Sequence, residues 1–224
     1  MDFNSDLATA SSSTASSATV STSAKATRRS ARSRLLDAAA TLFYADGMTA
    51  TGIDKITAEA GVAKKSLYNN FASKDELVRA YIEQRHEEWL ELYRARLAGV
   101  LAGKAGVFAG KSGVLAVFDA YLDHAEAAYP HGFRGCGLLN AAAELPAGAP
   151  GREAVRRHKE EVESLLVKHL EEAGAADSRG MAEHLSFLLE GAMSRAGLEG
   201  QPDKILHARK LAESLLESAA EQSL

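Results

Sequence analysis

Apolar residues recur every three or four positions over most of this chain, which is the spacing of helices with one buried face. In the segment "RSRLLDAAATLFYADG", residues 32–47, Gly47 supplies a helix stop after such a stripe. The apolar residues of that stripe are Leu35, Leu36, Ala39, Leu42 and Phe43. No stretch alternates apolar and polar residues as a strand would, and no segment is repeated. The pattern therefore predicts an all-α protein.

Two short helices are predicted on either side of Gly61, which can turn the chain because it has no Cβ atom. The first of them starts at Thr51, because Asp54 follows three residues later as in a capping box. The second spans about residues 63–70 and contains "KKSLYNN". Two short helices joined by a sharp turn predict a helix-turn-helix, whose second helix enters the major groove of DNA.

Longer helices, separated by Gly and Pro, are predicted for the rest of the chain. Ser73 and Glu76 form a capping box at the start of the first one. The Gly-rich residues 98–113 are predicted to be a flexible connection. They include "AGVFAGKS", which nearly matches a phosphate-binding loop, but Ala105 replaces the first glycine and no strand precedes it. The predicted longer helices span residues 73–97, 114–129, 137–145, 153–173, 179–197 and 203–220.

Composition is that of an ordinary globular protein, with 224 residues of which 46% are hydrophobic. The apolar runs are shorter than the roughly 20 residues that span a bilayer, so we expect no membrane contact. Residues 1–27 are mostly Ser, Thr and Ala and are predicted to be a disordered tail, with a transit peptide as the alternative. Because Cys136 is the single cysteine, we expect no disulfide within the chain and a cytoplasmic location.

Charge is distributed unevenly along the chain, although its sum is only −4. Between residues 25 and 79 there are ten Lys or Arg against six Asp or Glu, whereas the remainder has sixteen against twenty-four. A basic N-terminal part on an acidic body suits a protein that binds a polyanion with its N-terminal part. A solvated surface would give a similar excess.

The helix around "KKSLYNN" has two distinct faces when its residues are spaced at 100°. Leu67 and Phe71 fall on one face and are expected to anchor it, whereas Lys65, Tyr68 and Asn69 point outward. Lysine can neutralise phosphate or donate to guanine, and asparagine can pair with adenine. Periodicity alone would favour a solvated polar helix, so the residue types carry the prediction of a DNA-reading surface.

The segment "LLDAAATLFYADGMTATGIDKITAEAGVAKKSLYNNFASKDELVRA" resembles the DNA-binding domain of TetR-family transcriptional regulators. The resemblance implies a three-helix domain over residues 28–77, followed by a helical ligand-binding and dimerisation domain over residues 78–224. The sequence departs from the family pattern at Gly52, where a phosphate-binding hydroxyl is common, and at Thr57, where a small Ala is usual.

The same resemblance implies DNA contacts at eight positions. The sequence itself also predicts a basic N-terminal arm. Lys64, Lys65 and Asn69 fall where the family reads bases. The residues that fall where it contacts phosphates are Thr51, Ser66, Tyr68, Asn70 and Lys74. Arg28, Arg29 and Arg32 precede the first helix and could follow the DNA backbone or minor groove, although a solubilising basic cluster is an equal alternative.

In the body, the resemblance implies a homodimer through the last two helices and a pocket for a small-molecule effector. The predicted dimer stripes are Leu185, Leu188, Leu189 and Ala192 on one helix and Ile205, Ala208, Leu211, Ala212 and Leu215 on the other. Predicted pocket residues are Trp89, Tyr93, Phe118, Tyr121, Leu122, Leu139, Asn140 and Phe187, with His124 and Glu144 as polar groups that would orient the ligand. For each pocket residue, a place in the core is the plain alternative.

No constellation of catalytic residues, metal ligands or cofactor-binding groups is found in the sequence. "EQRH", from Glu83, is a single Glu-x-x-His where a di-iron bundle needs two. We therefore predict no enzyme activity and no cofactor. The predicted function is a ligand-responsive repressor that leaves a palindromic operator when an effector displaces the long helix after Ser73. Alternatives are a DNA-binding protein without an effector and a redox sensor in which Arg134 activates Cys136.

Overall fold

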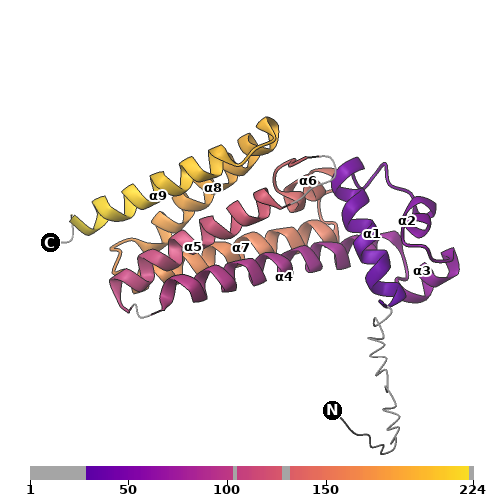
Figure 1. Cartoon of the computed structure of the whole chain (residues 1–224), viewed down its shortest axis with the longest axis horizontal. Helices are drawn as coiled ribbons and strands as arrows, with labels where there is room; N and C mark the ends of the chain where they lie inside the picture. Colours follow the sequence, from indigo (N-terminus) through magenta and orange to yellow (C-terminus); the bar gives the residue numbers. More distant parts are fainter. Residues whose placement is uncertain (1–28, 103–104, 128–131, 222–224) are drawn as a thin grey trace, which may run out of the picture.

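The computed structural model of the protein describes residues 29–102, 105–127 and 132–221. Within these residues the chain forms nine helices and no strand, as the apolar pattern predicts, and they are arranged as a small head and a long body (Figure 1). The predicted disordered tail, residues 1–27, lies outside the described part. The helices are α1 (Ala31–Asp46), α2 (Ile53–Glu59), α3 (Lys64–Asn70), α4 (Lys74–Leu101), α5 (Val107–Glu126), α6 (Gly137–Glu144), α7 (Pro150–Glu172), α8 (Ser178–Glu199) and α9 (Asp203–Glu221).

The head consists of α1, α2 and α3 around a small apolar core. Leu35, Ile56 and Leu67, one from each helix, are fully buried. Phe71 directly follows α3, is 1% exposed, and lies under the guanidinium of Arg32 at 5.0 Å from its ring centre. These contacts hold α3 against α1. A helix as short as α3 is not stable by itself in water, so it depends on them.

Turns within the head follow the sequence in part. Gly61 has φ of 59°, a left-handed conformation that other residues rarely adopt, and so turns the chain between α2 and α3. Half of the capping box at Ser73 is confirmed, because Ser73 Oγ accepts a hydrogen bond from Glu76 N–H at 3.1 Å. The Glu76 carboxylate accepts from Ala72 N–H and not from Ser73 N–H. The predicted capping box at Thr51 is wrong. Gly52 takes the N-cap position of α2 without a side-chain hydrogen bond.

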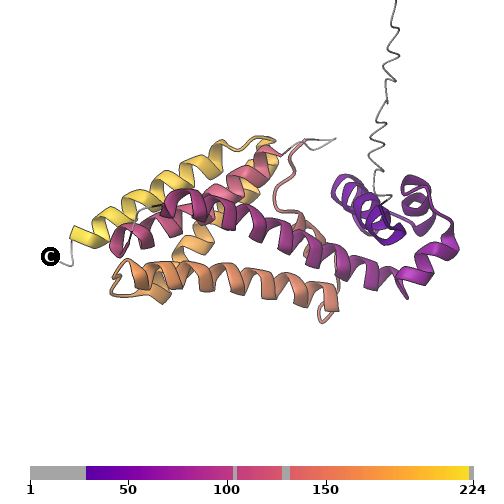
Figure 2. The same ribbon diagram turned by 60° about the horizontal axis from the view of Figure 1, so that its bottom comes forward.

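The body is a bundle in which α4 extends from the head along its whole length (Figure 2). Helices α5 and α7 pack on α4 and on each other, and α8 and α9 cover the side away from α4. Apolar residues at helical spacing fill the interior, among them Phe118, Leu166 and Leu185, all fully buried. Among the described residues, no helix is both long and apolar enough to cross a membrane.

Helix α4 continues to Leu101 and helix α5 starts at Val107, so the predicted flexible connection over residues 98–113 is wrong at both ends. The glycines of α5 allow a close approach to α7. A Cβ atom at Gly110 would lie 2.4 Å from the backbone N of Ala173, and one at Gly113 would lie 2.2 Å from the ring of His169. Sequence reasoning took these glycines for flexibility, but they form a contact surface between two helices.

Candidate nucleic-acid interface

Helix α3 presents an outward face made of Lys64, Lys65, Tyr68 and Asn69, which we call the recognition face. All four residues are exposed, whereas Leu67 between them is fully buried. The side chains of Lys65 and Asn69 have no hydrogen-bond or ion-pair partner among the described residues, so their polar groups face solvent. The arrangement can present an ammonium and an amide to a groove of DNA.

Lys64 differs from its neighbours because its Nζ lies 2.8 Å from a carboxylate oxygen of Asp54 on α2. The hydrogen bond and charge of Asp54 raise the pKa of Lys64 above its ordinary value. Both side chains are exposed, so water screens the pair and its contribution to stability is small. Lys64 can exchange Asp54 for a DNA group, but without DNA its ammonium is already paired.

Thr51 is fully buried, which contradicts its predicted contact with a phosphate. Its hydroxyl donates to the carbonyl oxygen of Gly47 at 2.6 Å, and Leu42 O lies 3.4 Å from it. The hydroxyl thus satisfies backbone groups where α1 ends, and it is not presented to a ligand.

Three other residues predicted to contact phosphate are partly buried and play local roles. Asn70 Nδ2 donates to Ser66 O at 2.7 Å, within α3. Lys74 Nζ donates to Met48 O at 2.6 Å and so joins the start of α4 to the turn after α1. An ammonium has three donors, so Lys74 retains capacity for a phosphate.

The predicted N-terminal arm is described only in part. Arg29 lies just before α1, and its guanidinium forms an exposed ion pair with Asp37 at 2.6 Å. Arg28 lies outside the described residues. The arm therefore begins beside the head, tied to α1 by one solvent-screened contact.

Head and body are joined by a set of polar contacts that we call the clamp, formed by Glu144, Arg134 and Tyr44. The Glu144 carboxylate, at the end of α6, accepts hydrogen bonds from Met48 N–H at 3.1 Å and Thr49 N–H at 2.7 Å. Burial acts to raise the pKa of Glu144, but these hydrogen bonds outweigh it and hold that pKa below its ordinary value. The carboxylate therefore binds the turn after α1 in its charged form.

Arg134 and Tyr44 complete the clamp at the end of α1. The Arg134 guanidinium donates to Tyr44 O at 2.9 Å and to Ala45 O. The Tyr44 hydroxyl accepts from Arg134 N–H at 2.6 Å and donates to Gly135 O at 3.2 Å. The guanidinium predicted to activate Cys136 thus binds carbonyl groups of α1, where a cation also complements the helix dipole.

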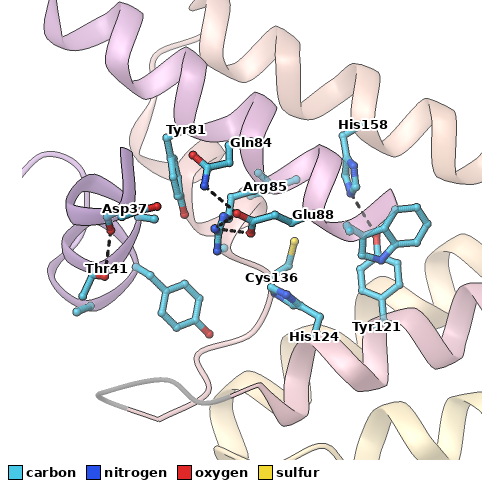
Figure 3. A pocket seen from close by; sticks show the side chains of 16 residues that line it. Asp37, Thr41, Tyr81, Gln84, Arg85, Glu88, Tyr121, His124, Cys136 and His158 are labelled. Atoms are coloured by element: carbon cyan, nitrogen blue, oxygen red, sulfur yellow. Dashed lines mark hydrogen bonds and ion pairs between the residues drawn. The ribbon is translucent and has the colours of Figure 1, made fainter. Parts of the chain in front are cut away.

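A cavity of about 300 Å³ lies directly behind the clamp, between α1, α4, α5, α6 and α7. We call it the junction cavity, because residues of the head form one of its walls (Figure 3). Its volume is at the lower end of the range for small-molecule sites. It is lined by Asp37, Ala40, Thr41, Tyr44, Ala45, Tyr81, Gln84, Arg85, Glu88, Trp89, Tyr121, His124, Cys136, Gly137, Leu138 and His158.

Of the eight predicted pocket residues, Trp89 and Tyr121 line the junction cavity. Tyr93 and Phe118 are buried outside it, with the Tyr93 hydroxyl 2.6 Å from His169 Nε2. Leu122 and Leu139 are half-buried and do not line it, and the exposed Asn140 donates to Arg134 O at 3.0 Å. Phe187 is 63% exposed on α8, away from the cavity.

Sequence reasoning missed the charged and histidine residues of the cavity, of which only His124 was predicted. A signal was present for Arg85. It lies four residues after Tyr81 and four before Trp89, both buried, so it is a charged residue in the apolar stripe of α4. His158 is 3% exposed, and its contact with Tyr121, 3.4 Å between Nε2 and the hydroxyl, depends on packing between α5 and α7.

The predicted dimer stripes divide between the interior and the surface. Most of their members pack within the chain, and the buried ones are Leu185, Leu189, Ala192, Ile205, Ala208 and Ala212. Leu211 and Leu215 are exposed on α9, as are Phe187 and Leu198 on α8 and Leu206 on α9. These five side chains leave an apolar surface on α8 and α9, where burial would remove apolar area from water.

Known proteins resemble this chain along both head and body. The model for bacterial regulatory proteins of the tetR family matches residues 35–81, and that for the tetracyclin repressor-like C-terminal domain matches residues 110–212. The HTH-type transcriptional repressor KstR2 of Rhodococcus jostii is 37% identical over 70 residues, which cover 30% of this chain and 34% of that repressor. That match spans only about a third of the repressor.

Solved structures resemble the chain over nearly their full length. A TetR-family transcriptional regulator from Streptomyces coelicolor is 33% identical, with a TM-score of 0.71 over 84% of this chain and 95% of that one. A TetR transcriptional regulator from Chloroflexus aurantiacus is 27% identical, with a TM-score of 0.67 over 84% of this chain and 94% of that one. Sequence and structure thus agree over both head and body, and the chain belongs to the TetR family of transcriptional regulators, which act by binding DNA and not by catalysis.

Proposed function

We propose that this chain is a homodimeric repressor that binds a palindromic operator through α3 and leaves it when a small molecule occupies the junction cavity. The observation that carries the proposal is the recognition face, where Lys65 and Asn69 point to solvent above the buried anchor of Leu67 and Phe71. Repression is the activity named for the Rhodococcus relative. Such a protein would act in the cytoplasm, where bacterial DNA lies.

In the proposed complex, some residues of α3 contact bases and others contact the DNA backbone. Lys65 and Asn69 read base edges, with Lys64 joining them after leaving Asp54. Tyr68, Ser66, Asn70 and Lys74 contact phosphates, and Arg28 and Arg29 follow the backbone beside α1. Thr51 holds the end of α1 by its internal hydrogen bond and takes no part in the proposed DNA contacts.

Dimerisation is proposed through the apolar surface of α8 and α9. Phe187, Leu211 and Leu215 are large apolar side chains exposed to water in the single chain, and a second copy would cover them. A Cβ atom at Gly191 would meet nothing within 4 Å, so a partner helix can approach closely there. Two recognition helices held about one DNA turn apart would read a palindrome.

Release of DNA is proposed to start at α1 as well as at α4. The sequence predicts a route through α4, but the junction cavity is lined by Tyr44 and Ala45 of α1, whose carbonyls the clamp holds. An occupant that binds better when these contacts are rearranged would shift the head relative to its partner's head. A coupling free energy of about 1 to 3 kcal/mol would weaken operator binding several-fold to over a hundredfold.

The proposal is tested by selecting bound fragments from a random DNA pool with the full-length protein. We expect one palindromic sequence to be enriched, with half-sites about one helical turn apart. Asn69→Ala should lose about 1 to 3 kcal/mol of binding to that sequence and relax the preference at one position of each half-site. Failure to enrich any sequence, or an unchanged preference for Asn69→Ala, would contradict the assignment of α3.

The effector part is tested separately with the selected operator. Compounds that raise the unfolding temperature of the protein are added to the complex, and release of DNA is followed by fluorescence anisotropy. If stabilising compounds never released DNA, the alternative of a DNA-binding protein without an effector would replace this part of the proposal.

A further inference from the structure

The junction cavity contains an ion pair in a mixed lining, which also includes Asp37, Thr41 and two histidines. Arg85 and Glu88, one turn apart on α4, form that pair, and Gln84 Nε2 also donates to the Glu88 carboxylate at 2.8 Å. Figure 3 shows the three side chains together between Tyr81 and His124. Because Glu88 already has two donors, its charge is matched without a ligand, and it offers little to a cationic molecule.

The buried polar atoms of the lining that lack a partner among the described residues are both donors. They are Nε of Arg85 and Nε1 of Trp89. Trp89 is only 4% exposed, so its N–H group is removed from water without compensation. Neither atom is reached by solvent. The donor that an occupant can meet is Nη1 of Arg85, which is not buried in this way and has no hydrogen-bond partner among the described residues.

The carboxylates of the lining, Asp37 and Glu88, are each paired with an arginine, and positive charges act on the two histidines beside them. Burial first, and then the charges of Arg85 and Lys159, lower the pKa of His124 to about 4. Burial, followed by Lys159 and the neighbouring histidines, lowers the pKa of His158 to about 3. Both rings are therefore neutral at physiological pH. Burial, the larger cause, disfavours any charge, so an anionic oxygen is favoured only where it meets the positive charge of Arg85.

The remaining lining suits an apolar body of limited size. Tyr81, Trp89 and Tyr121 supply aromatic surfaces, and Ala40 and Leu138 add aliphatic ones. The rings of Trp89 and Tyr121 lie 5.1 Å apart, so together they form a continuous wall. A cavity of about 300 Å³ is matched in size by a compact molecule.

We propose that the junction cavity takes a compact, mainly apolar molecule with a single carboxylate, and that Arg85 binds this carboxylate beside the aromatic wall of Trp89 and Tyr121. The proposal rests on the proposed function only in naming this molecule as the effector. Binding itself can be measured without DNA. Because Tyr44 belongs both to the lining and to the clamp, such an occupant would touch the head directly.

Trp89 is the single tryptophan of the chain and lines the cavity, so its fluorescence reports occupancy without a label. The full-length protein is titrated to millimolar concentrations of three probes of matched shape: cyclohexylacetate, cyclohexylacetamide and 2-cyclohexylethylamine. We expect a saturable change with the carboxylate, roughly tenfold weaker binding of the amide, and no saturable change with the amine. Equal binding of all three, or saturation by none, would overturn the proposed ligand class.

Arg85 variants test the residue assigned to the carboxylate. Arg85→Gln should abolish the preference for cyclohexylacetate over its amide, whereas Arg85→Lys should keep part of it because the charge remains. Arg94→Gln, an exposed change on the same helix outside the cavity, is the matched control and should bind as the wild type does. Circular dichroism melts establish that each variant is folded.

If Arg85→Gln failed to fold, the preference for cyclohexylacetate over its amide would be compared between Arg85→Lys and Arg94→Gln. A weaker preference in Arg85→Lys alone would support the role of Arg85. An unchanged carboxylate preference in a folded Arg85 variant would overturn the site. Operator binding is measured on the same samples by anisotropy. If the carboxylate binds but DNA is not released, the proposed site stands and the effector role is contradicted. If DNA binding responds to Asn69→Ala but no carboxylate binds, only the proposed site is contradicted.

Discussion

The head and the body of this regulator place their functional side chains in opposite directions. In the head, Lys65 and Asn69 point outward from a small core anchored by Leu67. In the body, Arg85 and Trp89 point inward to a cavity that several helices enclose. The outward face of a helix follows from its own periodicity, whereas an inward cavity exists only after the helices have packed. The two regions meet at α1, which carries the head and closes the cavity.

The largest expected effect comes from removing the anchor of the recognition face. Leu67→Ala should destabilise the head by about 2 to 5 kcal/mol and abolish operator binding, because it leaves a hole beneath α3. Glu171→Ala, an exposed change on α7 outside the recognition face and the apolar surface, is the control. Thermal unfolding and anisotropy are the measurements. If Leu67→Ala bound DNA normally, the outward residues would not depend on this core.

The second largest effect is expected from a variant that weakens dimerisation. Leu215→Glu places a charge in the proposed apolar surface of α8 and α9 and should weaken dimerisation by about 2 to 4 kcal/mol. Sedimentation should then show a monomer that still binds cyclohexylacetate but has lost tight operator binding. Glu217→Gln, an exposed change on the same helix, serves as the control. A stable dimer of Leu215→Glu would place the interface elsewhere.

A smaller effect is expected from Lys74, whose ammonium lies at the start of α4. Lys74→Ala should weaken binding to all DNA sequences to a similar extent and reduce the salt dependence of binding by about one phosphate contact. Asn69→Ala, by contrast, should change which sequence is preferred. Titrations at several salt concentrations distinguish the two. A change of sequence preference in Lys74→Ala would show that it acts on the structure of the head, through its hydrogen bond to Met48.

The smallest effect concerns the clamp and depends on pH. Because the folded-state pKa of Glu144 lies below its ordinary value, its stabilising contribution is present above the unfolded pKa of about 4.3 and is lost as pH falls through the lower folded value. Glu144→Gln should cost about 0.5 to 1 kcal/mol at neutral pH. The difference from wild type should vanish in acid, and a constant difference would exclude a role for the charge.

Much of the head could be predicted from the sequence because its elements are local. The burial of Leu67 and Phe71, the turn at Gly61 and the start of α4 at Ser73 all follow from short-range rules. Thr51 was predicted wrongly because a buried hydroxyl that bonds Gly47 and one that faces a phosphate look the same in sequence.

The body could be predicted only as a set of helices. Gly110 and Gly113 suggested flexibility, but the ring of His169 and the backbone of α7 occupy the space beside them. Phe187 was assigned to the pocket and lies on the surface, since the side of α8 that faces inward depends on its packing against α7 and α9. Tyr44 was missed because nothing local shows that α1 closes a cavity formed by distant helices.

Reciprocal binding tests most directly whether α1 links the two regions. The affinity of cyclohexylacetate, followed by Trp89 fluorescence, is measured with and without saturating operator, and operator affinity is measured with and without the probe. Because coupling between sites is reciprocal, we predict that each partner weakens the other by the same factor, several-fold or more. Probe binding that is unaffected by operator would contradict a link through the wall that head and body share.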